Sequence, residues 1–161
     1  MPKEIPGAKA MEIIMTSCSK CKNCASLLYD EEIIGGWSAE DNNLNTRCPF
    51  CSQCMVPFLT VHVLDHRHDG ESPRISEAIT IPYLSPLVLR RELESIIEKE
   101  GDACLGDDNC VDDHPHVYWN LVWYFQRIGV NSYLPGKIKC TFDFLSVFCY
   151  KMLFFFFILK N

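Results

Sequence analysis

The 161-residue sequence has no excess of basic residues, little glycine and proline, and no apolar run at its start. Its 15 Lys and Arg against 21 Asp and Glu give a net charge of −6. A general nucleic-acid binder is thereby disfavoured, because such a protein needs a basic surface to displace counterions. Eight Gly and nine Pro exclude a collagen-like or proline-rich chain. Since 48% of the residues are apolar, wholesale disorder is also excluded.

The first 15 residues carry charges and prolines where a secretory signal needs an apolar segment. We therefore expect a reducing compartment, cytosol or nucleus, in which paired cysteines bind metal more often than they form disulfides. The chain has ten cysteines, and six of them lie between Cys18 and Cys54. Their placement, more than their number, is informative about function.

The six clustered cysteines form two groups, CSKCKNC at 18–24 and CPFCSQC at 48–54. Two residues between cysteines allow a tight turn that aims both thiolates at one point, and a 23-residue spacer lets a second pair reach the same ion. This pattern predicts a closed tetrahedral site for a structural Zn²⁺ ion. The ligands that we predict are Cys21, Cys24, Cys48 and Cys51.

A small residue, Ala25 or Ser52, follows the second cysteine of each predicted pair, which favours close approach of backbone amides to sulfur. Cys18 and Cys54 remain as a spare pair or as alternative ligands. A histidine nitrogen is a further alternative, and the candidates are His62, His66 and His68.

Two other chemistries of cysteine pairs are disfavoured. A redox C-x2-C motif lies near a βαβ unit and starts a helix, and the sequence indicates neither. A catalytic zinc ion needs an open coordination position, which four thiolates do not leave. The sequence contains no evident catalytic constellation, so we expect no enzymatic activity.

The expected fold class is α+β, a small four-cysteine zinc ribbon followed by a helical, incomplete α/β segment. We divide the chain into a lead-in (1–17), the ribbon (18–64), a polar linker (65–80), a helical segment (81–136) and an apolar tail (137–161).

Within the ribbon we expect strands at 26–29 and 57–64, and turns at Gly35-Gly36 and at 41–43. Trp37 is expected to pack on the small core of the ribbon.

Two helices are expected in the second half. The first begins at the N-cap Ser85 with Pro86 in its first turn, carries one apolar face and ends at Gly101. The second begins near residues 112–115 and continues through the apolar stretch 117–125, for which a central strand is the alternative.

Several stretches together resemble a known family. They are CKNCASLLYDEEII (21–34), GWS (36–38), NLNT (43–46) with CPFC (48–51), PFL (57–59), PYLSPLVLR (82–90) with ELE (92–94), and His114-Pro115 with WNLVWYF (119–125). The ensemble resembles the C-terminal region of the type-4 DENN-domain proteins, the group that includes the c-Myc promoter-binding protein. The resemblance extends from about residue 11 to Gly136.

The resemblance implies a large cytosolic protein that promotes GDP–GTP exchange on Rab GTPases in membrane traffic. In that family the exchange activity belongs to the DENN module, which lies far upstream and is absent from this sequence. The expected function is therefore that of a structural or protein-interaction fragment. Its expected partners are the rest of a DENN-type protein and the Rab machinery, in the cytoplasm or peripherally on vesicle or Golgi membranes.

Zinc-dependent binding to promoter DNA is the alternative function that the name of this group suggests. Residues 18–64 carry three basic and five acidic residues, which disfavours contacts with phosphates.

The tail departs from the family pattern after Gly136 and resembles translated noncoding sequence in an incomplete gene model. Phe142–Leu159 is 18 residues long, but Asp143 and Lys151 interrupt it and leave an apolar run of eight. This is a poor membrane span, and membrane contact is expected only if the tail is a genuine part of the protein.

Overall fold

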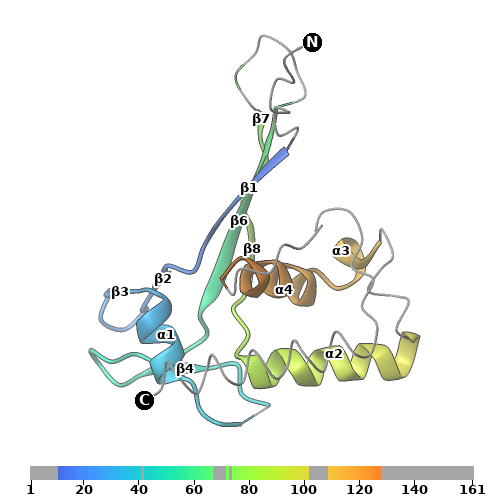
Figure 1. The fold of residues 1–161 in the computed structure, drawn as a ribbon. Helices are drawn as coiled ribbons and strands as arrows, with labels where there is room; N and C mark the ends of the chain where they lie inside the picture. The colour runs from blue at the N-terminus through green and yellow to red at the C-terminus, as the bar shows by residue number, and fades with distance from the viewer. Residues whose placement is uncertain (1–10, 41, 67–71, 73, 102–108, 128–161) are drawn as a thin grey trace, which may run out of the picture.

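The computed structural model describes residues 11–40, 42–66, 72, 74–101 and 109–127. These residues form the predicted mixture of helices and strands, an α+β fold. A four-stranded sheet occupies the middle, two short hairpins with a helix lie at one end, and the longer helices lie beside the sheet (Figure 1).

The sheet is antiparallel and is built around its longest strand, β6 (Phe58–Asp65). Strand β1 (Met11–Thr16) pairs with one side of β6, with Ile14 opposite His62. Strands β7 (Arg74–Ile75) and β8 (Ile79–Pro82) pair with the other side.

Three of these strands differ from the sequence-based expectation. Strand β1 lies in what we expected to be a lead-in, and β7 and the start of β8 lie in the stretch 65–80, which we expected to be a linker. The partner of β1 is about 50 residues away in the sequence, so the local pattern around residues 11–16 carries little sign of the pairing. The predicted strand at 57–64 is confirmed as β6, displaced by one residue.

The cysteine clusters lie in two small hairpins on either side of helix α1 (Asp30–Gly36). The first hairpin pairs β2 (Ser19–Lys20) with β3 (Leu27–Leu28), and the second pairs β4 (Thr46–Arg47) with β5 (Cys54–Met55).

The turn predicted at Gly35-Gly36 is wrong, because both glycines belong to the last turn of α1. At the other end of this helix the Glu32 carboxylate accepts a hydrogen bond from the Tyr29 N–H at 2.9 Å, which stabilises the first turn. At Gly36 the helix lies directly against β4, where an added Cβ would meet the backbone N and O of Arg47 at 2.8 and 2.5 Å. Glycine at position 36 therefore permits close packing of helix and hairpin.

Both helices predicted in the second half are confirmed. Helix α2 (Pro86–Glu100) begins with the Ser85 hydroxyl accepting from the Val88 N–H and ends at Gly101, whose φ is +84°. Helix α3 (Cys110–Asp113) is short, and α4 (Pro115–Arg127) includes the apolar stretch for which a strand was the alternative. This stretch is a helix and not a strand. Because α4 is covered on several sides, a helix that is apolar nearly all round is stable here. Its buried residues are Val117, Trp119, Asn120, Leu121, Val122, Tyr124 and Phe125.

The cysteine-bearing end and the helices share one hydrophobic core. Trp37, which follows α1, packs edge-to-face on Tyr83 with 4.9 Å between ring centroids, so it joins the two halves and does not serve the ribbon alone. An ion pair between the buried Asp30 of α1 and Arg127 of α4 makes a second link. The Arg127 guanidinium also lies 5.5 Å from the centroid of the Trp123 ring.

The buried side chain of Asn120 connects α4 to the segment between β8 and α2. Its Oδ1 accepts from the Leu84 N–H at 2.8 Å, and its Nδ2 donates to the carbonyls of Pro82 and His116 at 2.9 and 2.6 Å. One buried side-chain amide therefore ties α4 to the end of β8 and to the segment that precedes α2.

Within the described residues, no helix is both long and apolar enough to cross a membrane. The apolar tail 137–161, with its stretch 142–159, lies outside the described residues.

The two neighbouring glycines of α1 provide a matched test of its packing. We expect Gly36→Ala to lower the free energy of unfolding by ~1–3 kcal/mol, because the new methyl group collides with the backbone of Arg47. Gly35→Ala meets nothing within 4 Å and should raise it by up to ~1 kcal/mol through the unfolded-state entropy. Urea denaturation measures both; equal effects of the two changes would contradict the close contact at position 36.

Candidate metal centre

Each pair of predicted ligands, Cys21 with Cys24 and Cys48 with Cys51, lies in the same kind of tight turn, in which the backbone of the first cysteine of the pair makes two hydrogen bonds. In the first turn the Cys21 carbonyl accepts from the Ala25 N–H at 2.9 Å, and the Cys21 N–H donates to the Ser26 carbonyl at 2.9 Å. The second turn repeats this pattern: Ser52 N–H donates to the Cys48 carbonyl at 2.8 Å, and Cys48 N–H donates to the Gln53 carbonyl at 2.9 Å. The C-x2-C spacing thus produces two equivalent knuckles, defined here as residues 21–26 and 48–53.

The residue after each knuckle's second cysteine has an unusual backbone conformation. Ala25 and Ser52 both have φ of 61°, in the left-handed region. Small side chains tolerate this region better than bulky or β-branched ones do. The small residues noted at these positions in the sequence are therefore also explained by the turn geometry.

The two knuckles bring the sulfur atoms of Cys21, Cys24, Cys48 and Cys51 together, all within 4.8 Å of one another. Two sulfur–sulfur contacts join one knuckle to the other. The sulfurs of Cys21 and Cys51 are 3.6 Å apart, and those of Cys24 and Cys48 are 3.7 Å apart. Four sulfurs placed about 2.3 Å from a central Zn²⁺ ion would lie about 3.8 Å apart at the corners of a tetrahedron. The four thiols that we predicted as ligands therefore have a geometry that can hold a metal ion.

The four cysteines differ in burial, and the difference follows their position in the knuckle. The first cysteine of each knuckle is buried, with 1% exposure for Cys21 and 0% for Cys48. The second cysteines, Cys24 and Cys51, are partly exposed. The centre thus combines one pair of buried cysteines with one pair of partly exposed cysteines.

Hydrogen bonds and burial shift the thiol pKa values in opposite directions. The Ser26 hydroxyl, 3.3 Å from the Cys24 sulfur, and the Ser26 backbone lower the pKa of Cys24 to about 6. The Asn23 side chain and the Gln53 backbone lower the pKa of Cys51. Burial raises the pKa of Cys48 to about 11. Cys24 and Cys51 therefore lose their protons more readily than the buried Cys48, and the thiolate is the form that binds a metal.

The alternative ligands do not join this group among the residues that the structure describes. Cys18 and Cys54 lie outside it, as partly exposed and exposed thiols. His62 lies in β6, and the His66 Nε2 is 3.4 Å from a carboxylate oxygen of Glu12. His68 lies outside the described residues.

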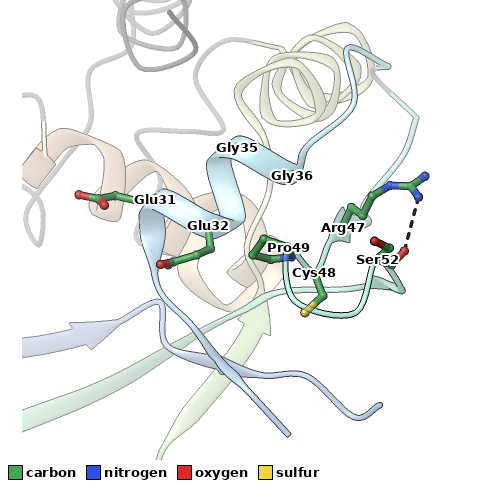
Figure 2. A pocket seen from close by; sticks show the side chains of 8 residues that line it. All are labelled: Glu31, Glu32, Gly35, Gly36, Arg47, Cys48, Pro49 and Ser52. Atoms are coloured by element: carbon green, nitrogen blue, oxygen red, sulfur yellow. Dashed lines mark hydrogen bonds between the residues drawn. The ribbon is translucent and has the colours of Figure 1, made fainter. Parts of the chain in front are cut away.

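A cavity of about 480 Å³, which the sequence pattern did not indicate, borders the centre. One wall comes from α1 and the other from the second knuckle and the strand before it (Figure 2). The Arg47 guanidinium donates to the Ser52 carbonyl across the knuckle at 3.4 Å. The lining residues are Glu31, Glu32, Gly35, Gly36, Arg47, Cys48, Pro49 and Ser52. The cavity depends on how α1 packs against the second knuckle, which the pattern of residues in either segment does not indicate.

No family model matches the chain, and no solved structure matches it significantly. The cysteine centre is therefore interpreted from its geometry alone.

The left-handed residues of the knuckles can be tested by paired substitutions. Ala25→Gly should raise the free energy of unfolding by up to ~1 kcal/mol, because glycine occupies this region without strain. Ala25→Val should lower it by more than ~1 kcal/mol, since a β-branched residue is disfavoured there. Chemical denaturation measures both. Lys22→Gly, at an exposed knuckle position without positive φ, is the control and should be destabilising; the same sign for Lys22→Gly and Ala25→Gly would contradict the assignment.

Proposed function

We propose that the chain is a structural and protein-interaction module built on one Zn²⁺ ion, which Cys21, Cys24, Cys48 and Cys51 bind as thiolates. The observation that carries this proposal is the approach of these four sulfurs to within 4.8 Å of one another. An all-sulfur tetrahedral set suits zinc, or iron in a sulfur site, better than the oxygen-seeking ions calcium and magnesium. With all four positions taken by protein, such an ion has no open site for a substrate and its role is structural.

The zinc ion would supply stability that the hairpins lack. Each hairpin contributes strands of two residues, too short to be stable alone in water. The apparent free energy of zinc binding in small finger peptides is ~10–16 kcal/mol, enough to hold two such hairpins together. We describe this part of the fold as a zinc ribbon, whose two knuckles close on the ion and hold α1 between them.

We further propose that the module corresponds to the C-terminal region of a type-4 DENN-domain Rab exchange factor. The sequence stretches that carry the resemblance contact one another in the structure, which supports treating them as one folding unit. Trp37 from GWS packs on Tyr83 from PYLSPLVLR, and the Tyr83 hydroxyl accepts from the Trp123 Nε1–H at 3.0 Å. Trp123 belongs to WNLVWYF, and Asn120 of the same stretch bonds Leu84.

In this proposal the helical segment after the ribbon is an incomplete α/β unit. The partners are the remainder of a DENN-type protein and Rab machinery in the cytoplasm, with peripheral attachment to vesicle or Golgi membranes. The exchange surface itself belongs to the upstream module, so the chain does not catalyse exchange.

Charge around the centre disfavours the alternative, binding of promoter DNA. Helix α1 begins with three acidic residues, two of which line the cavity beside the second knuckle. Arg47, the basic residue of that cavity, already bonds the Ser52 carbonyl. A phosphate approaching this face would meet carboxylates, which raise the cost of binding.

Metal analysis of the full chain with single Cys→Ser changes tests the centre. We expect one zinc per chain, lost on replacing any of Cys21, Cys24, Cys48 or Cys51, because three sulfurs leave the tetrahedron open. Cys18→Ser and Cys54→Ser are matched controls that should keep the zinc. Iron in place of zinc, or zinc retained without Cys24 and Cys51, would overturn the assignment.

A nucleotide-release assay tests the proposal that this chain does not itself catalyse nucleotide exchange on Rab GTPases. The chain should leave the release of fluorescent GDP from a panel of Rab GTPases unchanged, because the stretches that carry the resemblance do not belong to the module that catalyses exchange in that family. A full-length type-4 DENN protein is the positive control. Acceleration of release by this chain, abolished by Cys48→Ser, would show that the exchange surface lies in the module itself.

A further inference from the structure

Strand β1 presents an open edge of the central sheet. It pairs with β6 on one side, and the part of the chain that the structure describes supplies no strand for its other side. Proteins usually guard such an edge with charged side chains, lysine above all, with proline, with a bulge or with a very short strand. Strand β1 has six residues, MEIIMT, without lysine or proline, and Glu12 near its start is its one charged residue. By contrast, β7 has two residues and β8 contains Pro82.

Hydrogen bonds of β6 show which backbone groups of β1 face outward. Val63 donates its N–H to the Ser76 hydroxyl and accepts the Ser76 N–H on its carbonyl, so its backbone faces the β7 side. Phe58 bonds Ser19 through both backbone groups, on the β1 side. Even-numbered residues of β6 therefore point their N–H and C=O groups toward β1. Their partners in β1, such as Ile14 opposite His62, point theirs toward β6.

The odd-numbered residues of β1 consequently point their N–H and C=O groups away from β6. For Ile13 and Met15, opposite Val63 and Val61, no hydrogen bond to a described residue satisfies these groups. Their side chains lie on the core face of the sheet, whereas Ile14 lies on the other face and is 49% exposed. The edge thus combines unpaired backbone groups with an exposed apolar side chain.

The sequence of β1 is complementary to itself about Ile14. If two copies pair antiparallel with Ile14 opposite the partner's Ile14, then Ile13 lies opposite Met15 and Glu12 lies opposite Thr16. No like charges meet, and apolar side chains share the core face. Ile13 and Met15 then exchange backbone hydrogen bonds, and the two Ile14 residues form the close, non-hydrogen-bonded pair in which side chains approach most nearly.

We propose that β1 is a self-association edge, on which a second copy of this chain docks its own β1 to form one continuous eight-stranded sheet. Helix α4 packs on β6 and β8, and α2, α3 and α4 lie on the side of the sheet away from β1 (Figure 1), so these three helices leave the edge uncovered. A contact made by single strands is small, so the dimer is weak and concentration-dependent. The inference does not depend on the zinc ion or on the DENN resemblance.

Sedimentation equilibrium of the full 18.5 kDa chain tests the proposal. The wild-type mass should rise toward that of a dimer with concentration. Ile14→Lys and Ile14→Glu should each weaken self-association at least tenfold, because like charges then meet at the twofold axis. An equimolar mixture of the two variants should restore dimers. Ile75→Lys, at a 66% exposed residue of β7, is the control and should dimerise as the wild type does.

Amide hydrogen exchange supplies a second readout that needs no variant. The amides of Ile13 and Met15 should exchange more slowly as the wild-type concentration rises, whereas that of Ile14 should not change. A wild-type chain that stays monomeric would overturn the proposal, even if these amides are protected, since another segment of the same chain would then cover the edge. Association that Ile14→Lys leaves unchanged, or that the mixture does not restore, would overturn it as well.

Discussion

The convergence of four cysteine sulfurs is the constraint on which the N-terminal part of this structure depends. The hairpins that carry them are minimal, and helix α1 between them has seven residues. Isolated helices and hairpins of this size are unstable in water. Bringing both knuckles to one point fixes the two ends of the 18–55 segment and thereby places α1, whose residues contact the rest of the protein.

That placement matters because the two halves of the described chain are interdependent. Trp37 and Asp30, at the two ends of α1, contact Tyr83 and Arg127 of the second half. Because α1 lies between the two knuckles, we expect that loss of the zinc ion that we propose would disturb these contacts as well.

The sequence was most informative where chemistry or capping is local. Regular C-x2-C spacing identified the four thiols that the structure brings together, and Ser85, Pro86 and Gly101 marked both ends of α2. It was least informative for β1 and α1. Strand β1 depends on a partner about 50 residues away, and the end of α1 at Gly36 depends on close contact with β4. Long-range pairing and close packing leave few local signals.

What the sequence determined alone is the set of four cysteine side chains that could hold a metal ion and the caps of α2, because both rest on patterns of residues a few positions apart. Tertiary structure decided which strands pair, that Trp37 bridges the two halves, and that no strand of the described residues pairs with the outer side of β1 at Ile13 and Met15. These features are contacts between residues that are distant in the chain, and many different local sequence patterns are compatible with such contacts.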